Sequence, residues 1–239
     1  MLSENEFNAI RDGGKTEVLE IDGVNYVTKP VFDPRQPDPV STPLVVAGLS
    51  GLVEYLAAHK DDPGMPLPIA HVVGFDRVDL IGPPVDRFRL RHTFATAKAA
   101  WPEGLKFGQY LDLETMNVQL QALYAGTTDR EKVLAVVGKV EDVNTAEVAD
   151  DGVTQSITVK AGISRLGREQ APNPVFLAPF RTFRELDQPL SQFILRLRAG
   201  TPPTAALHEA DGGAWKLEAV KRIKDWLTVN LPEGTPIVG

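Results

Sequence analysis

The fold is decided towards the C-terminal end of the chain, by the stretch Phe193-Ile194-Leu195-Arg196-Leu197-Arg198. Side chains alternate along a strand, so the three odd-numbered residues form one apolar face and the two arginines lie on the other face. After the break Gly200-Thr201-Pro202-Pro203, residues 204–209 can pair back as a hairpin. The stretch therefore predicts a strand of an antiparallel sheet that packs on one face only.

An amphipathic helix is predicted after this hairpin. Asp211 is placed to cap it, and Gly212 and Gly213 ease the turn. Its apolar residues recur at spacings of three and four: Trp215, Ala219, Val220, Ile223, Trp226, Leu227 and Leu231. We expect this stripe to cover a sheet of its own subunit, and truncation of Trp226 to destabilise the fold.

The segments further upstream alternate between strand and helix patterns. Hairpins are predicted around Asp22-Gly23 and between residues 136–148 and 153–163, and three antiparallel strands over 69–73, 77–81 and 86–96, with a break at Gly82-Pro83-Pro84. Helices are predicted over residues 3–11, 50–60 (capped by Ser50), 113–124 and 128–134 (capped by Thr128 and Glu131). The pattern predicts an α+β protein, with an antiparallel sheet core, flanking helices and a C-terminal packing helix.

A proline-rich segment, residues 29–43, separates the first hairpin from the rest of the chain. Its prolines exclude a helix and a central strand: Pro30, Pro34, Pro37, Pro39 and Pro43. We interpret it as an extended arm that ends an N-terminal part, residues 1–43, before a main α+β domain, residues 44–239. Val31, Phe32 and Val40 could anchor the arm in a groove of a neighbouring subunit. The alternative is an intramolecular strap between the hairpin and the main domain.

Composition excludes several classes of protein. The 239 residues are 43% hydrophobic, enough for one large core or two small ones. The absence of cysteine excludes disulfides, thiolate metal sites and a cysteine nucleophile. The longest apolar runs, residues 44–49 and 174–179, are too short to cross a bilayer and no secretion signal is found, so no membrane partner is expected.

Arg87, Arg89 and Arg91 are the candidate nucleic-acid-binding residues. On a strand their side chains share one face at intervals of about 6–7 Å, close to the spacing of successive phosphates. Phe88 points the other way and the net charge is −7, so we expect weak or no binding at physiological salt. The alternative is a solvated sheet face, or a face that pairs with Asp and Glu of another subunit. Paired strands would create a second basic patch from Arg181, Arg184, Arg196 and Arg198.

No catalytic pattern is found in the sequence. The histidines His59, His71, His92 and His208 lack metal-binding spacing. His71 with Asp76 and Asp79 could gather a metal or act as a base, but a turn and a strand explain these two acids equally well. Nucleophile-elbow, P-loop and dinucleotide motifs are absent. The sequence therefore predicts no catalytic residue, no metal site, no cofactor and no enzymatic activity.

Four motifs carry a resemblance to a known family: Asp150-Asp151-Gly152-Val153-Thr154-Gln155, Pro179-Phe180-Arg181-Thr182-Phe183, Asp187-Gln188-Pro189 and Glu209-Ala210-Asp211-Gly212-Gly213-Ala214-Trp215. Over residues 44–227 the sequence resembles a family of uncharacterised tailed-phage and prophage proteins, the YfdQ-like group. The resemblance implies a phage-encoded protein of the host cytoplasm. The family has no assigned activity or catalytic residues to carry over.

Three functional hypotheses remain from the sequence. The first is a non-enzymatic phage protein that self-assembles into a symmetric homo-oligomer, a ring or a closed shell. The second is a nucleic-acid-binding accessory factor of phage replication or recombination that uses the face of Arg87, Arg89 and Arg91. The third is an enzyme whose site forms only in three dimensions, around His71 or His208.

Overall fold

The computed structural model describes residues 18–21, 24–27, 42–58, 66–85, 90–141, 147–150, 155–161, 165–170 and 172–239. The chain divides into two compact units, residues 1–41 and residues 42–239. In the first unit, β1 (Val18–Ile21) and β2 (Val24–Val27) pair antiparallel, which confirms the first predicted hairpin. The predicted N-terminal helix lies outside the described residues.

The second unit contains a five-stranded sheet with the order β14-β4-β5-β6-β3. β4 (Ile69–Gly74), β5 (Arg77–Val85) and β6 (Leu90–Lys98) are antiparallel neighbours, as predicted. β3 (Leu44–Val46) and β14 (Ile237–Val238) add parallel strands at the two edges.

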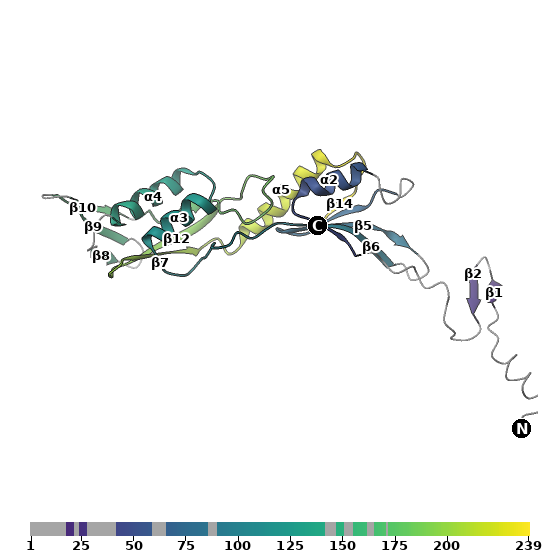
Figure 1. Cartoon of the computed structure of the whole chain (residues 1–239), viewed down its shortest axis with the longest axis horizontal. Coiled ribbons are helices and arrows are strands. Elements are labelled where there is room, and N and C mark those ends of the chain that lie inside the picture. Colours follow the sequence, from purple (N-terminus) through teal and green to yellow (C-terminus); the bar gives the residue numbers. More distant parts are fainter. Residues whose placement is uncertain are drawn as a thin grey trace, which may run out of the picture. The chain divides into compact units, whose positions relative to one another are not determined.

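Helices cover one face of this sheet. α2 (Leu49–Ala58) and α5 (Ala214–Asn230) lie on the same side of it (Figure 1). The core between them contains Leu49, Leu52, Leu56, Ala70, Val72, Val78, Leu80, Ala95, Ala97, Ile223, Leu227 and Leu231. The amphipathic stripe of α5 therefore covers a sheet of its own subunit, as predicted.

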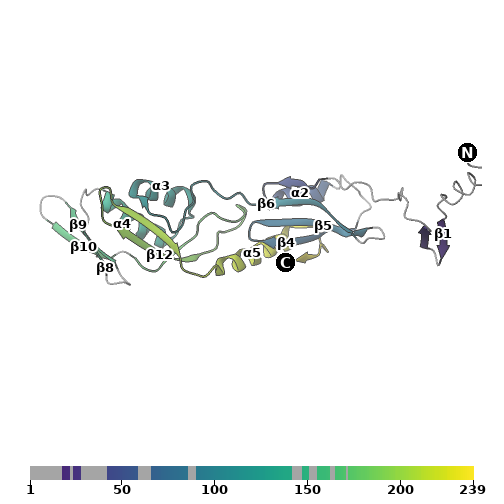
Figure 2. The same ribbon diagram turned by 90° about the horizontal axis from the view of Figure 1, so that it is seen from below.

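A four-stranded antiparallel sheet has the order β11-β12-β13-β7. Its strands are β11 (Val175–Leu177), β12 (Ser191–Arg198), β13 (Thr204–Glu209) and β7 (Leu111–Asp112). Helices α3 (Leu113–Leu123) and α4 (Thr128–Glu141) cover one face (Figures 1 and 2). On that face Phe193, Leu195 and Leu197 are buried, as the alternation in the sequence predicts. Two layers of helices on antiparallel sheets confirm the α+β class.

A three-stranded sheet lies between α4 and β11 in the sequence, with the order β10-β9-β8. β8 (Glu147–Asp150) and β9 (Gln155–Ala161) form the predicted hairpin, and β10 (Arg165–Gln170) pairs with β9. The prediction that this hairpin begins at residue 136 is wrong, because α4 continues to Glu141. Val133, Val136 and Val137 have helical spacing and are buried in the core under α4.

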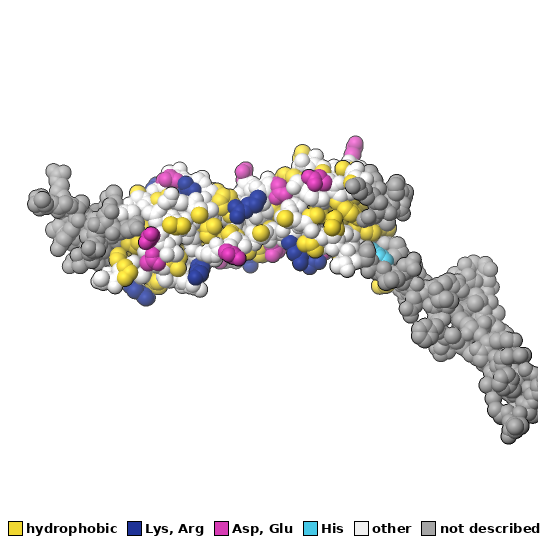
Figure 3. All heavy atoms as spheres, in the orientation of Figure 1, with side chains coloured by type: hydrophobic (Ala, Val, Ile, Leu, Met, Phe, Trp, Pro, Cys, Tyr) yellow, Lys and Arg dark blue, Asp and Glu magenta, His cyan; other side chains and the backbone are white. Residues whose placement is uncertain are grey.

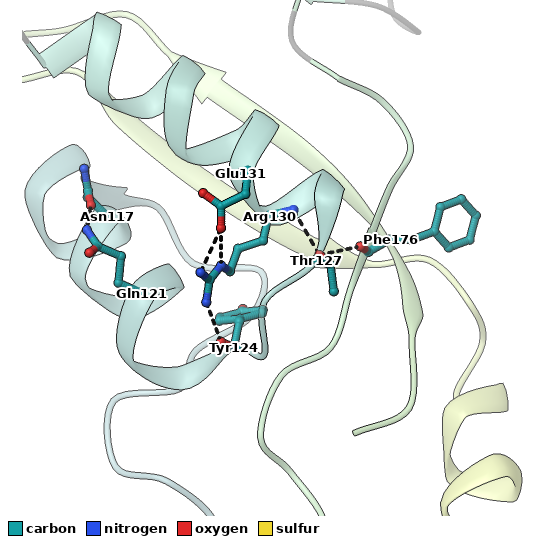
Figure 4. A network of polar contacts seen from close by, with 7 residues as sticks. All are labelled: Asn117, Gln121, Tyr124, Thr127, Arg130, Glu131 and Phe176. Carbon is teal, nitrogen blue, oxygen red and sulfur yellow. Dashed lines mark hydrogen bonds and ion pairs between the residues drawn. The ribbon is translucent and has the colours of Figure 1, made fainter. Parts of the chain in front are cut away.

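The polar groups at the start of α4 also hold the edge of the neighbouring sheet (Figure 4). Thr127 Oγ1 accepts a hydrogen bond from Arg130 N at 3.0 Å, so Thr127, and not Thr128 as predicted, caps the helix. Asp129 Oδ2 accepts from Phe176 N at 2.9 Å, and Thr127 Oγ1 donates to Phe176 O at 3.4 Å. These side chains form hydrogen bonds with the backbone N–H and C=O of Phe176 on the outer edge of β11. A further strand therefore cannot pair with β11 at this residue.

β5 differs from the prediction at Gly82-Pro83-Pro84, which is part of the strand and not a break. The register between β5 and β6 shifts between Leu80 and Ile81, and again before Pro84. Bulges of this kind leave backbone positions outside the regular hydrogen-bond ladder. Proline has no N–H to donate, so it is tolerated at positions where the ladder needs no donor.

The segment 178–190 connects the two cores. Glu185 Oε1 accepts hydrogen bonds from Ser50 N at 3.1 Å and from Ser50 Oγ at 3.2 Å. This carboxylate therefore accepts a hydrogen bond from a backbone N–H in the first turn of α2, whereas the sequence predicted that Ser50 itself would cap the helix. Buried Gln188 holds the segment in shape, because its side chain accepts from Arg181 N and Thr182 N and donates to Phe183 O and Leu186 O.

Tyr124 is 1% exposed in the core beneath α3, and its burial should make the free energy of unfolding fall at alkaline pH. Burial raises the pKa of its hydroxyl, which accepts a long hydrogen bond of 3.4 Å from Gln119 Nε2. As the pH rises, the hydroxyl therefore ionises at a lower pH in the unfolded chain than in the folded one. Its contribution to stability is complete below the unfolded pKa of about 10 and is lost as the pH rises above that value.

Tyr124→Phe should therefore lose less stability than the parent between about pH 9 and pH 11. Urea denaturation followed by circular dichroism at pH 7 and across this range measures the difference. Tyr110→Phe is the matched control, because Tyr110 is 37% exposed and should leave the parent profile unchanged. Parallel losses in the parent and in Tyr124→Phe would contradict this account.

Candidate interaction surface

The candidate site is the face of the five-stranded sheet opposite α2 and α5. Strand register places one side chain from each strand in a row across it: Val238, His71, Asp79, Thr96 and Val45. The two end residues are apolar and exposed, Val238 by 46% and Val45 by 61%. Asp79 and Thr96 are buried. The row is thus polar in its centre and apolar at both edges of the sheet.

The buried carboxylate of Asp79 is fully engaged. Arg77 donates from Nε to Oδ1 at 2.9 Å and from Nη2 to Oδ2 at 2.8 Å, and Thr96 Oγ1 donates to Oδ1 at 2.8 Å. The hydrogen bond and the charge of Asp79 raise the pKa of Arg77. A bidentate pair of this kind makes the centre of the face neutral, which is what permits its burial.

More apolar side chains surround this centre. Ile69 and Ile81 are cross-strand partners on the same face and are partly buried, and Val73 is 49% exposed. Lys98 pairs with Arg77 at the end of the face. An apolar surface around a neutral polar centre is suited to contact with another protein surface and offers no charged groove for a polyanion.

The predicted trio of His71, Asp76 and Asp79 comes together only in part. His71 lies directly opposite Asp79, but the carboxylate takes its hydrogen bonds from Arg77 and Thr96. Asp76 lies in the turn between β4 and β5. Among the described residues no group of three or more His, Asp or Glu side chains could hold a metal ion.

The predicted nucleic-acid-binding strand is described only at Arg91, since Arg87 and Arg89 lie outside the described residues. Arg91 is exposed on β6 and donates from Nη1 to Gly82 O at 3.3 Å. On the side of the molecule that Figure 3 draws, lysine, arginine and acidic side chains are interspersed with apolar ones. That side carries no continuous basic surface.

The second predicted basic patch does not include Arg181, which is buried with a side chain that is 0% exposed. Its guanidinium lies 3.6 Å from the ring centre of Trp215, and the rings of Phe107 and Phe193 lie at 5.8 and 5.7 Å. It donates to Glu209 and to Ser191 Oγ. Burial lowers the pKa of Arg181 and the charge of Glu209 opposes that effect.

The other predicted site residues are placed as follows. The arm residues Val31, Phe32 and Val40 lie outside the described residues, as does His59. His92 is partly buried on β6, and its Nε2 has no hydrogen-bond partner among the described residues. His208 lies on β13 beside the ring of Tyr110. His92 and His208 therefore lie in different sheets.

The open sheet face has little signal in the sequence. Asp79 was interpreted as an ordinary outward strand residue, and Val45 and Val238 belong to edge strands that were not predicted. The only local signal was the alternation of residues 69–73 and 77–81, which has apolar residues in both phases. A strand with apolar residues on both faces is typical of a sheet that is covered on both faces.

Comparison with known proteins identifies no relative: no family model matches the chain, and no curated protein or solved structure is significantly similar to it. In the part of the chain that is described, no helix is long and apolar enough to cross a membrane.

Proposed function

We propose that this chain is a non-enzymatic, phage-encoded protein of the host cytoplasm that self-assembles into a symmetric homo-oligomer, a ring or a closed shell. The observation that supports self-assembly is the open face of the five-stranded sheet. Apolar side chains exposed on one face of a sheet, with polar residues among them, are typical of a surface that binds another protein. The phage origin comes from the sequence resemblance alone.

The pattern on this face fits a second copy of itself. The row Val238, His71, Asp79, Thr96, Val45 runs from apolar through polar to apolar. A two-fold axis near Asp79 would set Val238 of one copy against Val45 of the other, and His71 against Thr96. Such a self-complementary patch is what an isologous interface requires. The neutral Arg77–Asp79 pair avoids opposing like charges at the axis.

One isologous interface closes a dimer, so a ring or a shell needs a second contact. The proline-rich segment 29–43 supplies it by lying across a neighbouring subunit, with Val31, Phe32 and Val40 as anchors. Proline restricts the unbound chain, so less conformational entropy is lost on docking than for a flexible linker of equal length. β3, which follows this segment directly, is an edge strand of the five-stranded sheet.

Light scattering coupled to size-exclusion chromatography tests the proposal. We expect the intact protein to elute with a multiple of its 26.0 kDa mass. The double variant Val45→Asp and Val73→Asp places charges on two exposed positions of the face and should lower the mass. Val118→Asp is the matched control, because Val118 is 60% exposed on α3 and should leave the mass unchanged.

A version that lacks residues 1–41 tests the arm separately. It retains the second compact unit, residues 42–239, and should form dimers but no larger assembly. An intact protein that is monomeric would overturn self-assembly altogether. An unchanged mass after truncation would remove the arm from the assembly, and an unchanged mass of the charged double variant would remove the sheet face.

A further inference from the structure

A second open sheet face carries a different chemistry. α3 and α4 pack against one side of the four-stranded sheet. Alternation and register place a mixed set of side chains on the opposite side: Phe176, Gln192, Ile194, Arg196, Arg198, Thr204, Ala206 and His208. Two arginines, a histidine and an aromatic ring thus share this face.

Phe176 is the first notable member of this set. It is 47% exposed although its neighbours Val175 and Leu177 are fully buried on the other face. Its backbone is held on both sides, by Asp129 at the N–H and by Thr127 at the carbonyl. Figure 4 shows its ring pointing away from this polar network. The strand therefore presents an aromatic ring to solvent from a fixed position.

A second aromatic group lies at the opposite edge of the same face. The Tyr110 ring is 37% exposed, and the Arg198 guanidinium lies over it at 3.8 Å from the ring centre. The His208 ring is 6.5 Å from that of Tyr110, edge to face. From β11 to β7 the sheet crosses three strand spacings, roughly 15 Å, so the two aromatic groups flank the width of the face.

Three acidic residues of the neighbouring elements are bonded to groups outside this face. Asp112 accepts from Thr115 N at 2.8 Å and from Thr115 Oγ1 at 2.7 Å at the start of α3, which lowers its pKa. Glu209 bonds Arg181 on the other side of the sheet, and Asp129 pairs with Lys132 at 2.9 Å. These three carboxylates are therefore not bonded to Arg198, whose guanidinium brings positive charge to this face.

We propose that this face binds single-stranded nucleic acid, with bases stacked on Phe176 and on the Tyr110–Arg198 pair. Aromatic rings on an open sheet, accompanied by arginine, bind unpaired bases by stacking and phosphates by charge. The predicted strand of Arg87, Arg89 and Arg91 has no aromatic residue on its arginine face. On the face of the four-stranded sheet, aromatic rings and arginine lie on one surface. This site does not depend on the proposed self-assembly, which uses the other sheet.

Fluorescence anisotropy of the intact protein with labelled oligothymidylate and oligouridylate, each of about 20 nucleotides, tests the proposal. We expect saturable binding at low salt that weakens as salt rises, because phosphate contacts release counterions. Phe176→Ala should weaken binding at least about fivefold. Arg198→Ala should weaken it and reduce the salt slope by about 1. Lys221→Ala on α5 removes the same charge elsewhere and should change little.

Phe176→Leu distinguishes stacking from simple apolar contact. Leucine keeps an apolar side chain but has no ring, so a stacking site loses binding in this variant as it does in Phe176→Ala. No saturable binding up to about 100 μM protein at low salt would overturn the proposal, as would full binding by Phe176→Leu. A lower particle mass in Phe176→Ala would overturn it too, since the face would then be a subunit interface.

Discussion

Replacement of Ile223 by alanine is expected to lower the free energy of unfolding by about 2–5 kcal/mol. Ile223 is 0% exposed in the middle of α5, and the core that it joins contains residues of β4, β5 and β6 as well as α2. Truncation leaves a cavity where the helix contacts the sheet, so both the transfer free energy of the lost carbons and the surrounding packing contacts are lost. That is a large share of the stability of a domain.

Urea denaturation followed by circular dichroism measures this change in unfolding free energy. Two further variants on the same helix serve as comparisons. Leu217→Ala, at a position that is 77% exposed, should change stability by less than about 0.5 kcal/mol. Trp226→Ala should lie between the two, because Trp226 is only partly buried and not a core residue as its place in the apolar stripe suggests. If Ile223→Ala unfolds like Leu217→Ala, α5 is peripheral and the core assignment is wrong.

The elements that sequence reasoning predicts well are those whose pattern is local. β12 alternates between buried and less buried residues along its whole length, because one face of its sheet packs on α3 and α4. The two-residue turn between β1 and β2, and the apolar spacing in α5, likewise depend on residues close together in the sequence. Local geometry alone dictates these features.

Long-range contacts explain what sequence reasoning misses. The cap of α2 comes from Glu185, which is 135 residues from Ser50 in the sequence. β3 and β14 are short strands that pair in parallel with β6 and β4, which lie far from them in the sequence. The open sheet face depends on this register, so its row of side chains could not be assembled before the order of the strands was known.

Arg181 illustrates the same limit at one residue. The sequence places an arginine near other arginines, which favours an exposed basic patch, because charged side chains are rarely fully buried. What buries it is a set of partners from elsewhere in the chain: Phe107, Ser191, Phe193, Glu209 and Trp215. Glu209, near the start of α5 in the sequence, neutralises this cation.

Replacement of Arg181 by alanine is expected to destabilise the fold by about 3–5 kcal/mol, comparable to truncation of a large core side chain. The guanidinium fills the space between three aromatic rings and stacks on Trp215, so alanine leaves a cavity and removes the cation–π contact. Arg181→Met should cost less, because methionine fills most of this volume and carries no charge that needs a partner.

The partner Glu209 allows the charge and packing contributions to be separated. Glu209→Gln leaves Arg181 buried without its carboxylate and should cost about 2 kcal/mol, less than the breaking of a fully buried pair, because Glu209 is 39% exposed. In the Arg181→Met background the same change should cost almost nothing, since no buried cation remains. Urea denaturation of the four proteins in this double-mutant cycle measures the coupling. Equal costs of Glu209→Gln in both backgrounds would mean that the aromatic rings hold Arg181 without help from the carboxylate.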